Sequence, residues 1–484
     1  MPEIIGFSDS MRDPSGETVN IAVVGCGYVG LVAAVCFAEI GHNVVCVDND
    51  EEKIEALQQG RIPIHESLLA DLLSKQRHSA LAFTTSLPDA VRSAEAIFIA
   101  VGTPPLENGD ADLSYVESVA AEIARSVNGY KVIVEKSTVP VYTSDWVGRV
   151  LRRKGVERAQ VDVVSNPEFL REGTAVSDFL HPDRIVVGTT SDRAYRVLSR
   201  IYRPLTDGSY YRKEGSVPGT CNDSQPAPIL RTSAKSAELI KHASNAFLAM
   251  KISFINTVAN LCEAVDADIE EVAQGMGMDR RIGSRFLSAG LGYGGSCFPK
   301  DIKAFRAIGQ QLGMDFTLLK EVERINEQQQ AHFLRKVRSI LWNLRNKKLA
   351  VLGLAFKGGT DDIRESPAIS LVRSFLAEGC RVVAYDPAAM EKARSILHST
   401  NLSMTDNAYD AMKDADALVV LTEWPEFAQL DLDEVKRLLA HPIVFDGRNL
   451  FDRIKMAELG FTYVSVGRPA AEECTEMMAV ARRA

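Results

Sequence analysis

The sequence lacks a long apolar run, a surplus of basic residues and paired cysteines, and each absence excludes a class of protein. The formal net charge of −9 gives no broad electrostatic attraction to nucleic acid or to an anionic membrane, so neither is expected as a partner. No apolar run approaches the roughly 18–20 residues that span a bilayer. Residues 1–17 have no basic start followed by an apolar stretch, so we expect no secretory signal and a cytoplasmic protein.

The cysteines are scattered along the chain. None of the eight belongs to a CxxC pair, and none has a histidine at metal-ligand spacing, which argues against zinc and against a disulfide framework. We therefore expect reduced thiols and no bound metal. The eight are Cys26, Cys36, Cys46, Cys221, Cys262, Cys297, Cys380 and Cys474.

What the sequence does have is enough length for several cores. A single core stops growing near ~250–300 residues, so 484 residues predict two or three domains. Apolar runs at 20–25 and 44–48 flank a helical pattern that ends near Glu39, and this order defines a parallel βαβ unit. A doubly wound sheet is predicted over about the first 210 residues. Its further strands are expected at 96–102, 131–138, 161–166 and 184–188.

The pattern changes after this sheet and later returns. Residues 207–228 have loop composition, a long helix is expected from Thr232 to about Asp266, and a second helical block covers 301–342. The strand and helix alternation restarts with strands at 347–356, 380–387, 417–422 and 442–447 and a helix at 366–379. The fold class is α/β, with a Rossmann-type domain, a central helical domain and a Rossmann-like C-terminal domain. The expected divisions are an extension (1–18), the first domain (19–215), a polar loop (216–228), the helical domain (229–340) and the last domain (341–484).

The segment GCGYVG (25–30) predicts a dinucleotide site, because it closes a strand and opens a helix. Gly25 permits the tight turn, Gly27 lets pyrophosphate approach the backbone, and Gly30 lets the helix pack on the strand. Asp48 ends the next strand, where its carboxylate accepts from ribose hydroxyls and repels a 2′-phosphate, so NAD is favoured over NADP. Lys53 either helps to position the ribose or is a solvated surface lysine. A turn without a ligand is the alternative for the whole segment.

Two further turns are expected beside the nicotinamide half. VGTPP (101–105) and STV (137–139) follow predicted strands, and ligands of doubly wound sheets lie beyond the carboxyl ends of the strands. Each turn taken separately has a purely structural interpretation.

The densest motif is GLGYGGSCFPKD (290–301). Its glycines allow the backbone to come close to a ligand. Cys297 stands where a helix is expected to begin, and the positive end of the helix dipole favours the nucleophilic thiolate. Asp301 lies one turn further on. Most free cysteines are inert core residues, and that interpretation is applied to the other seven.

Two pairs of polar residues remain open on spacing alone. Lys241 and Asn245 lie at i and i+4 of the long helix, either as an oxyanion clamp or as an exposed polar stripe. Glu168 and Glu172 in NPEFLREG (166–173) are either functional carboxylates or part of a solvated turn.

From about residue 19 to 470 the chain resembles the UDP-glucose/GDP-mannose dehydrogenase family. The motifs that carry the resemblance are GCGYVG, VGTPP, EKSTVP, NPEFLREGTA, ELIKHASNAF, GYGGSCFPKD, FKGGTDDIRES and FDGRN, in the family's order. The resemblance implies an NAD domain, a central helical linker used for dimerisation, and a C-terminal domain that helps to hold the nucleotide. A homodimer or higher homo-oligomer is therefore expected.

The resemblance also implies roles for individual residues. Cys297 would be the nucleophile, Lys241 and Asn245 would stabilise oxyanions with Asp301 assisting, and Glu168 and Thr138 would position or activate water. The implied cofactor-binding residues are Gly25, Gly27, Tyr28, Val29, Gly30, Asp48, Lys53, Gly102, Thr103, Pro104, Ser137, Thr138, Glu172, Lys300 and Arg364. The implied substrate-binding residues are Phe169, Leu170, Arg171, Glu172, Lys241, Asn245, Arg281, Phe286, Leu287, Gly290, Gly292, Tyr293, Gly294, Phe356, Lys357 and Arg448. Arg281 would reach across a dimer interface.

The implied reaction oxidises a primary alcohol of a nucleotide sugar to a carboxylate through a thiohemiacetal and a thioester on Cys297. At two positions, Gly173 and the Phe298 that follows Cys297, the sequence resembles the branch of the family that acts on UDP-glucose. The alternatives are GDP-mannose or a UDP-N-acetylhexosamine as substrate, a two-electron NAD dehydrogenase, and a nucleotide-binding regulator without turnover.

Overall fold

The computed structural model describes residues 18–106, 109–219 and 225–469, and it divides into two compact units. Unit 1 comprises residues 1–244 and 303–312, and unit 2 comprises residues 245–302 and 313–484. The expected N-terminal extension, apart from Thr18, and the middle of the expected polar loop (220–224) lie outside the described residues.

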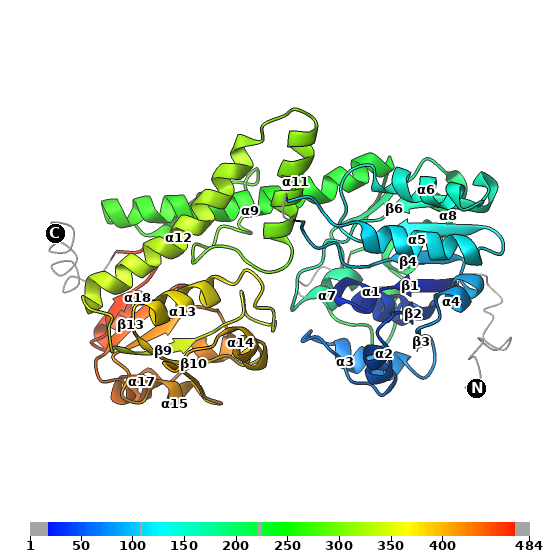
Figure 1. Ribbon diagram of the computed structural model, residues 1–484. Coiled ribbons are helices and arrows are strands. Elements are labelled where there is room, and N and C mark those ends of the chain that lie inside the picture. Colours follow the sequence, from blue (N-terminus) through cyan, green and yellow to red (C-terminus); the bar gives the residue numbers. More distant parts are fainter. Residues whose placement is uncertain (1–17, 107–108, 220–224, 470–484) are drawn as a thin grey trace. The chain divides into compact units, whose positions relative to one another are not determined.

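Unit 1 is built on an eight-stranded sheet with the order β3-β2-β1-β4-β5-β6-β7-β8. All neighbouring strands are parallel except β6 and β7. The first six strands follow the order 3-2-1-4-5-6, which is typical of dinucleotide-binding folds. The strands, drawn in blue to green in Figure 1, are β1 (Asn20–Val24), β2 (Asn43–Val47), β3 (Leu81–Thr84), β4 (Ala96–Ile99), β5 (Lys131–Glu135), β6 (Val161–Ser165), β7 (Ile185–Gly188) and β8 (Ile229–Thr232).

Helices bury both faces of this sheet, because successive side chains of a strand point to opposite sides. Val23 and Phe98 belong to the core beneath α1, α3, α7 and α8, whereas Ala22 and Ile97 belong to the core beneath α4, α5 and α6. The helices are α1 (Tyr28–Glu39), α2 (Glu51–Gln58), α3 (Leu69–Gln76), α4 (Leu87–Ser93), α5 (Ser114–Ser126), α6 (Thr143–Arg153), α7 (Ala175–Leu180) and α8 (Asp192–Thr206), with the 3₁₀ helices η2 (Arg158–Gln160) and η3 (Tyr210–Arg212).

Four helices follow between the two sheets in sequence: α9 (Ala234–Val265), α10 (Ile269–Gly277), α11 (Phe298–Gln311) and α12 (Thr317–Leu341). The unit boundary falls inside α9, after Ser244, and inside α11, after Ile302. The long helix expected from Thr232 begins at Ala234 instead, because Thr232 ends strand β8. The expected block 301–342 is two helices, since Gly313 (φ +74°) lies between them in a conformation that a helix does not use.

Helix α9 is 32 residues long, and among the described helices it alone has the length and mean hydropathy to cross a membrane. The core helix of a soluble protein passes the same test. The buried side chain of Glu238 accepts hydrogen bonds from the backbone N–H groups of Tyr142 and Ser144, and buried Asn256 accepts one from Gly290. The sequence has no unbroken apolar run long enough to span a bilayer, as stated above. That statement did not anticipate a helix that reaches this length with a sufficient mean hydropathy.

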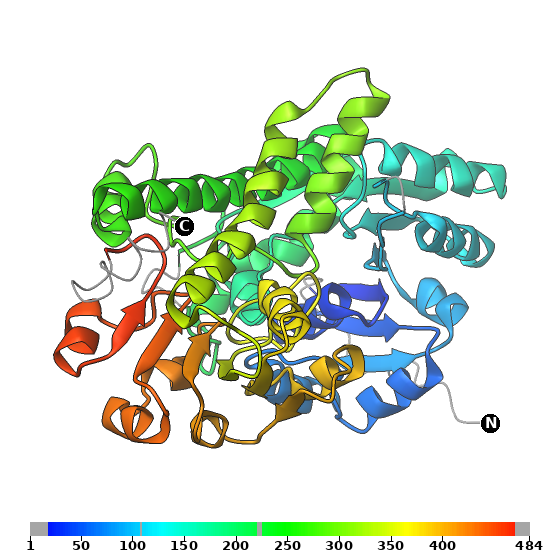
Figure 2. The same cartoon turned by 60° about the vertical axis from the view of Figure 1, so that its left-hand side comes forward.

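Unit 2 contains a six-stranded parallel sheet with the order β11-β10-β9-β12-β13-β14. Counted from its own first strand, this order is again 3-2-1-4-5-6. The strands, drawn in yellow to red in Figure 2, are β9 (Lys348–Leu352), β10 (Arg381–Tyr385), β11 (Leu402–Met404), β12 (Ala417–Val420), β13 (Ile443–Asp446) and β14 (Thr462–Val464).

The second sheet is also covered on both faces. Leu349 and Val419 pack into a core with α13 and α14, and Ala350 and Leu418 pack into a core with α15 to α18. The predicted Rossmann-like C-terminal domain is thereby confirmed. Its helices are α13 (Pro367–Ala377), α14 (Met390–Ile396), α15 (Ala408–Met412), α16 (Pro425–Ala428), α17 (Leu432–Leu438) and α18 (Arg453–Glu458).

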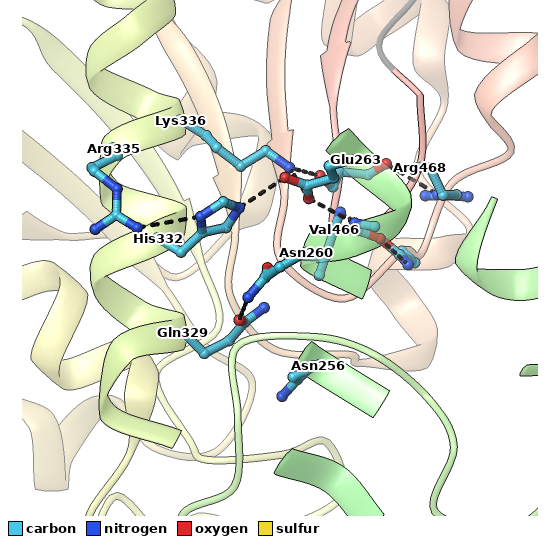
Figure 3. Close-up of polar contacts among 12 residues, drawn as sticks. Asn256, Asn260, Glu263, Gln329, His332, Arg335, Lys336, Val466 and Arg468 are labelled. Atoms are coloured by element: carbon cyan, nitrogen blue, oxygen red, sulfur yellow. Dashed lines mark hydrogen bonds and ion pairs between the residues drawn. The ribbon is translucent and has the colours of Figure 1, made fainter. Parts of the chain in front are cut away.

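A polar network in unit 2 joins α9 and α12 to the segment after β14 (Figure 3). The Glu263 carboxylate accepts hydrogen bonds from His332 Nε2 at 2.8 Å, Lys336 Nζ at 2.6 Å and the backbone N–H of Gly467 at 2.7 Å. Burial alone would raise the pKa of Glu263, but the hydrogen bond from His332 and the charge of Lys336 lower it to about 2. The network fixes the two helices against the sheet of the same unit.

Candidate active site

The glycine loop after β1 (25–30) is tightly packed at Gly30 and open at Gly27. A Cβ atom on Gly30 would lie 1.8 Å from the carbonyl oxygen of Gly25, so no side chain fits there. A Cβ on Gly27 would meet nothing within 4 Å, although Gly27 is the N-cap residue of α1. Space beside a helix N-terminus suits the pyrophosphate of a dinucleotide, which the free N–H groups and the helix dipole attract.

Asp48 is held beside this loop at the end of β2. Its Oδ2 accepts hydrogen bonds from the backbone N–H of Cys26 at 2.8 Å and from Lys53 Nζ at 3.1 Å. Burial alone would lower the pKa of Lys53, but the hydrogen bond and charge of Asp48 raise it above its usual value. The carboxylate is thereby fixed where a ribose would be recognised, and Lys53 is its ion-pair partner.

The turns after β4 and β5 lie together at the same edge of the sheet. Thr103 Oγ1 donates a hydrogen bond to the carbonyl oxygen of Thr138 at 2.8 Å, and Ser137 Oγ donates one to Ile99. The two predicted nicotinamide turns, 101–105 and 137–139, are therefore in direct contact. Burial raises the pKa of the neighbouring Glu135 to about 8.

Glu66, which the sequence did not single out, connects the glycine loop to the segment after β6. The backbone N–H of Gly173 donates to Tyr28 Oη at 2.8 Å and to Glu66 Oε2 at 2.7 Å, and Tyr28 Oη also donates to Glu66. Burial, strengthened by Glu66, raises the pKa of Tyr28 above its usual value. Glu66 therefore positions the residue next to Glu172, one of the predicted cofactor ligands.

Glu168 and Lys241 form a buried ion pair. Glu168 Oε1 lies 2.8 Å from Lys241 Nζ, and the two side chains are 4% and 5% exposed. Glu168 Oε2 accepts a hydrogen bond from the backbone N–H of Leu170, and Lys241 Nζ lies 5.6 Å from the ring centroid of Phe169. The interpretations of Lys241 as part of an exposed stripe and of Glu168 as part of a solvated turn are both wrong.

In unit 2, Asn245 is paired with Asp301. Asn245 Nδ2 donates to Asp301 Oδ2 at 2.6 Å, and Lys300 Nζ lies 3.2 Å from the other carboxylate oxygen. Asp301 is 1% exposed, and its backbone N–H donates to the carbonyl oxygen of Cys297, which closes the first turn of α11. Lys241 and Asn245, one turn apart on α9, thus each have an acidic partner.

Cys297 directly precedes α11, as predicted. Of the six described cysteines it alone is not buried; Cys26, Cys36, Cys46, Cys262 and Cys380 are core residues. A half-exposed thiol at a helix start can reach a substrate, and the helix dipole favours its thiolate.

Three amide side chains, all unpredicted, hold the glycine-rich loop before Cys297. Asn326 of α12 accepts from the backbone N–H of Tyr293 at 2.8 Å and donates to its carbonyl oxygen at 3.0 Å. Gly290 donates to Asn256 of α9 at 2.8 Å and accepts from Gln329 of α12 at 3.0 Å; Figure 3 labels both amides. The loop is thereby pinned at two points.

Predicted substrate residues lie on the other side of this loop, beyond the carboxyl ends of β9 and β13. Arg448 Nη2 donates to the carbonyl oxygen of Phe356 at 2.8 Å. A Cβ on Gly295 would lie 2.7 Å from the Phe356 ring, so only glycine fits against it. Lys357 Nζ lies 5.5 Å from the same ring. These residues line the edge where ligands of such sheets bind.

Other predicted residues are engaged elsewhere. Arg281 is 89% exposed and pairs with Asp279, and Leu287 is buried in the core of unit 2. Arg364 forms a bidentate pair with Asp362. Arg171 likewise pairs with Asp178.

Two sheets that share the strand order 3-2-1-4-5-6 over six strands, a glycine loop beside a carboxylate and a partly exposed thiol before a helix define a dinucleotide-dependent oxidoreductase. Family models identify it further. The NAD binding domain of the UDP-glucose/GDP-mannose dehydrogenase family matches residues 19–206, its central domain matches 235–328, and its UDP binding domain matches 350–453. The chain belongs to this family, and the predictions of family, fold class and NAD as cofactor are confirmed.

Similar proteins cover nearly the whole chain. UDP-glucose 6-dehydrogenase TuaD of Bacillus subtilis (strain 168) is 46% identical over 93% of this chain and 94% of its own length. UDP-glucose 6-dehydrogenase of Rhizobium meliloti (strain 1021) is 46% identical over 93% of this chain and 100% of its own. The solved UDP-glucose dehydrogenase of Pyrobaculum islandicum is 38% identical and superposes with a TM-score of 0.83 over 94% of this chain and 100% of its own.

Proposed function

We propose that this enzyme oxidises the C6 alcohol of UDP-glucose to the carboxylate of UDP-glucuronate with two molecules of NAD. The names of the two relatives at 46% identity support this substrate. The observation that carries the chemistry is Cys297, the one described cysteine outside the core, in a loop pinned by buried amides. A two-electron dehydrogenase would need no thiol.

The overall reaction balances as alcohol, two NAD⁺ and water giving carboxylate, two NADH and three protons. When bound, NAD accepts the hydride in each oxidation stage. The Cys297 sulfur adds to the carbon of the intermediate aldehyde and forms a thiohemiacetal, which the second oxidation converts to a thioester. Water then attacks the thioester carbon, the carbon–sulfur bond breaks, and the thiolate returns.

The buried polar pairs supply the electrostatics of these stages. Lys241 and Asn245 donate hydrogen bonds to the substrate oxygen on which negative charge develops, and donors in a dry site stabilise such charge far better than water does. Asp301 orients Asn245 through their 2.6 Å hydrogen bond. Glu168, assisted by Thr138, accepts a proton from the attacking water.

The ligands are assigned to the carboxyl edges of the two sheets. NAD is assigned to the glycine loop, to Asp48 and to the turns after β4 and β5. Glu172 is assigned to the same site, because it precedes Gly173, whose backbone N–H is held by Glu66. The uridine nucleotide is assigned to the edge beyond β9 and β13 with Phe356, Lys357 and Arg448. The match of residues 350–453 to a UDP binding domain supports this assignment. Arg281 and Arg364 are proposed as ligand contacts on the resemblance alone.

The competing substrates are GDP-mannose and UDP-N-acetylhexosamines. A solved UDP-D-ManNAc dehydrogenase from Pyrococcus horikoshii is 28% identical with a TM-score of 0.77 over 93% of this chain and 99% of its own, so the fold alone does not separate these sugars. Purified enzyme should be given NAD and each sugar nucleotide in turn, and NADH absorbance followed. We expect turnover with UDP-glucose; turnover only with a UDP-N-acetylhexosamine would refute the substrate, and no turnover with any would favour a regulator.

We also propose a homodimer formed through α9 and a cytoplasmic location. Phe247, Phe254 and Leu261 recur every seven residues on α9 and are 58%, 52% and 61% exposed, so they form one apolar stripe. The proposed subunit division is 19–215, 229–340 and 341–484. Six described cysteines are free thiols, which is the state that a reducing cytoplasm maintains.

A further inference from the structure

A second buried ammonium group lies beside the Glu168–Lys241 pair. Lys136 follows the last residue of β5 and is 3% exposed. Its Nζ donates hydrogen bonds to Asn166 Oδ1 at 3.2 Å and to the carbonyl oxygen of Asn166 at 3.4 Å. A buried lysine costs stability unless its charge is used or compensated, so this one requires an explanation.

Asn166, which Lys136 contacts, is the junction of several elements of unit 1. Its backbone N–H donates to the carbonyl oxygen of Glu135 of β5 at 2.9 Å, and its Nδ2 donates to the carbonyl oxygen of Val186 of β7 at 2.8 Å. Tyr202 of α8 donates from Oη to Asn166 Oδ1 at 2.6 Å. Asn166 begins the turn that carries Glu168 two residues later, so Lys136 helps to fix where that carboxylate lies.

The charges around Lys136 act in opposite directions. The pKa of Lys136 is lowered to about 8, mainly by burial; the carboxylate of Glu168 opposes this shift and the ammonium of Lys241 adds to it. The Glu168 carboxylate therefore attracts two ammonium groups, those of Lys136 and Lys241. Other groups near this cluster are the Tyr202 hydroxyl, the ring of Phe179, 5.9 Å from Lys136 Nζ, and Arg184, stacked on Phe169.

We propose that Lys136 is a positioning residue for the Glu168–Lys241 pair: it anchors the turn of Glu168 through Asn166, and its ammonium charge attracts the Glu168 carboxylate and repels the Lys241 ammonium. This inference rests on the proposed function, which gives Glu168 and Lys241 their roles. Without the charge of Lys136, the Lys241 ammonium is no longer repelled and should keep its proton to higher pH.

The test compares Lys136→Met and Lys136→Gln with a matched control at the other end of β5. Lys131 is also buried, at 6% exposure, and donates to the carbonyl oxygens of Ala94 and Arg92 at 2.6 and 3.2 Å. Burial lowers its pKa too, but its partners are backbone groups at the opposite end of β5. Lys131→Met is thus expected to lose stability while retaining the wild-type pH profile.

For Lys136→Met we expect kcat to fall by roughly 10- to 100-fold, with the KM for NAD unchanged. The basic limb of the kcat profile, where Lys241 loses its proton, should move to higher pH by on the order of one unit. Lys136→Gln retains a donor for Asn166 but no charge, so it should recover part of kcat and none of the pH shift. Tyr202→Phe removes the other donor to Asn166 Oδ1 and should lower kcat without moving the limbs.

A readout without turnover separates this inference from the proposed function. With ¹³Cε-labelled lysine, and Lys241 assigned by Lys241→Met, NMR should show the Lys241 ammonium titrating at higher pH in both Lys136 variants. An unchanged Lys241 titration would overturn the inference even if the enzyme oxidises UDP-glucose. If neither Lys136 variant folds, a wild-type kcat in Tyr202→Phe overturns the anchoring role. A wild-type protein inactive on every sugar with a shifted titration would instead reject the proposed function alone.

Discussion

At the scale of single residues, Cys297 differs from the other described cysteines in exposure and in the backbone around it. Five of the six described thiols are buried in cores, whereas Cys297 directly precedes α11 and its carbonyl oxygen caps the first turn of that helix. The glycines before it allow close approach, and the amides of α9 and α12 hold them in place. The thiol is both reachable and fixed in position, as a nucleophile must be.

Replacing this sulfur tests its role directly. Cys297→Ser should lower turnover by roughly 100-fold or more, because an alkoxide forms far less readily than a thiolate at neutral pH. Cys380→Ser is the matched control: Cys380 is fully buried in unit 2, and a serine can keep its hydrogen bond to the carbonyl oxygen of Leu344. Steady-state NADH production by both variants decides the matter. Equal rates in Cys297→Ser and wild type would contradict the covalent mechanism.

Gly27 separates ligand binding from folding. An added methyl group would meet no atom within 4 Å, and the φ of −75° suits alanine, so Gly27→Ala should leave the free energy of unfolding within about 1 kcal/mol of wild type. The same methyl group would occupy the space assigned to pyrophosphate, and NAD affinity should fall roughly tenfold or more. Calorimetric titration with NAD measures this. Gly275 in α10 is equally open, so Gly275→Ala should bind NAD with wild-type affinity. If Gly27→Ala also binds NAD with wild-type affinity, the assignment of the cofactor to this loop is wrong.

Which site residues the sequence could predict depends on how far apart the partners lie along the chain. Lys241 and Asn245 share a helix face, and Gly25 to Asp48 form one βαβ unit, so local patterns indicated them. Glu66 contacts Gly173 across 107 residues, and Asn256, Asn326 and Gln329 hold a loop more than thirty residues away. Only the folded chain brings those partners together.

At the scale of elements, the strands that the sequence missed are the edge strands. β3 and β8 end the first sheet, and β11 and β14 end the second. Central strands are buried on both faces and appear as continuous apolar runs, whereas an edge strand such as β8 is half exposed and carries Arg231 and Thr232. The predicted strands 96–102 and 131–138 stop at Ile99 and Glu135, since their last residues form the turns of the site.

The Glu263 network predicts a dependence of stability on pH within unit 2. The pKa of Glu263 falls from 4.5 to about 2 on folding, so its contribution is present above pH 4.5 and is lost as the pH falls toward 2. That contribution is about 3 kcal/mol. Glu263→Gln should therefore lower the free energy of unfolding at pH 7 by a similar amount, and the deficit should shrink in acid. Glu271→Gln, on the exposed face of α10, should change neither value.

Chemical denaturation between pH 3 and pH 7 measures both effects. A deficit in Glu263→Gln that stays constant over this range would contradict the ion-pair account. In that case the network shown in Figure 3 would stabilise α9 and α12 by packing alone.

At the scale of the whole molecule, the two sheets share the order 3-2-1-4-5-6 over six strands, and each sheet is assigned one ligand. The first carries the NAD loop and the second matches a UDP binding domain. Lys241 and Glu168 belong to unit 1, whereas Asn245, Asp301 and Cys297 belong to unit 2. Helix α9 carries both Lys241 and Asn245.

The apolar stripe of α9 predicts the assembly state. Phe254→Glu places a charge in the middle of the stripe and should convert a dimer to monomers in sedimentation velocity runs. Ile454→Glu is the control, since Ile454 of α18 is 61% exposed and lies outside the stripe. If the Phe254→Glu protein still sediments as wild type does, the proposed interface on α9 is wrong.

The central claim is a four-electron oxidation on one enzyme, and the number of NADH molecules formed per sugar tests it most directly. Limiting UDP-glucose is converted to completion with excess NAD, and NADH is measured by absorbance while the sugar product is quantified by mass spectrometry. The account predicts two NADH and one UDP-glucuronate for each UDP-glucose. A ratio of one, with an aldehyde as the product, would contradict it.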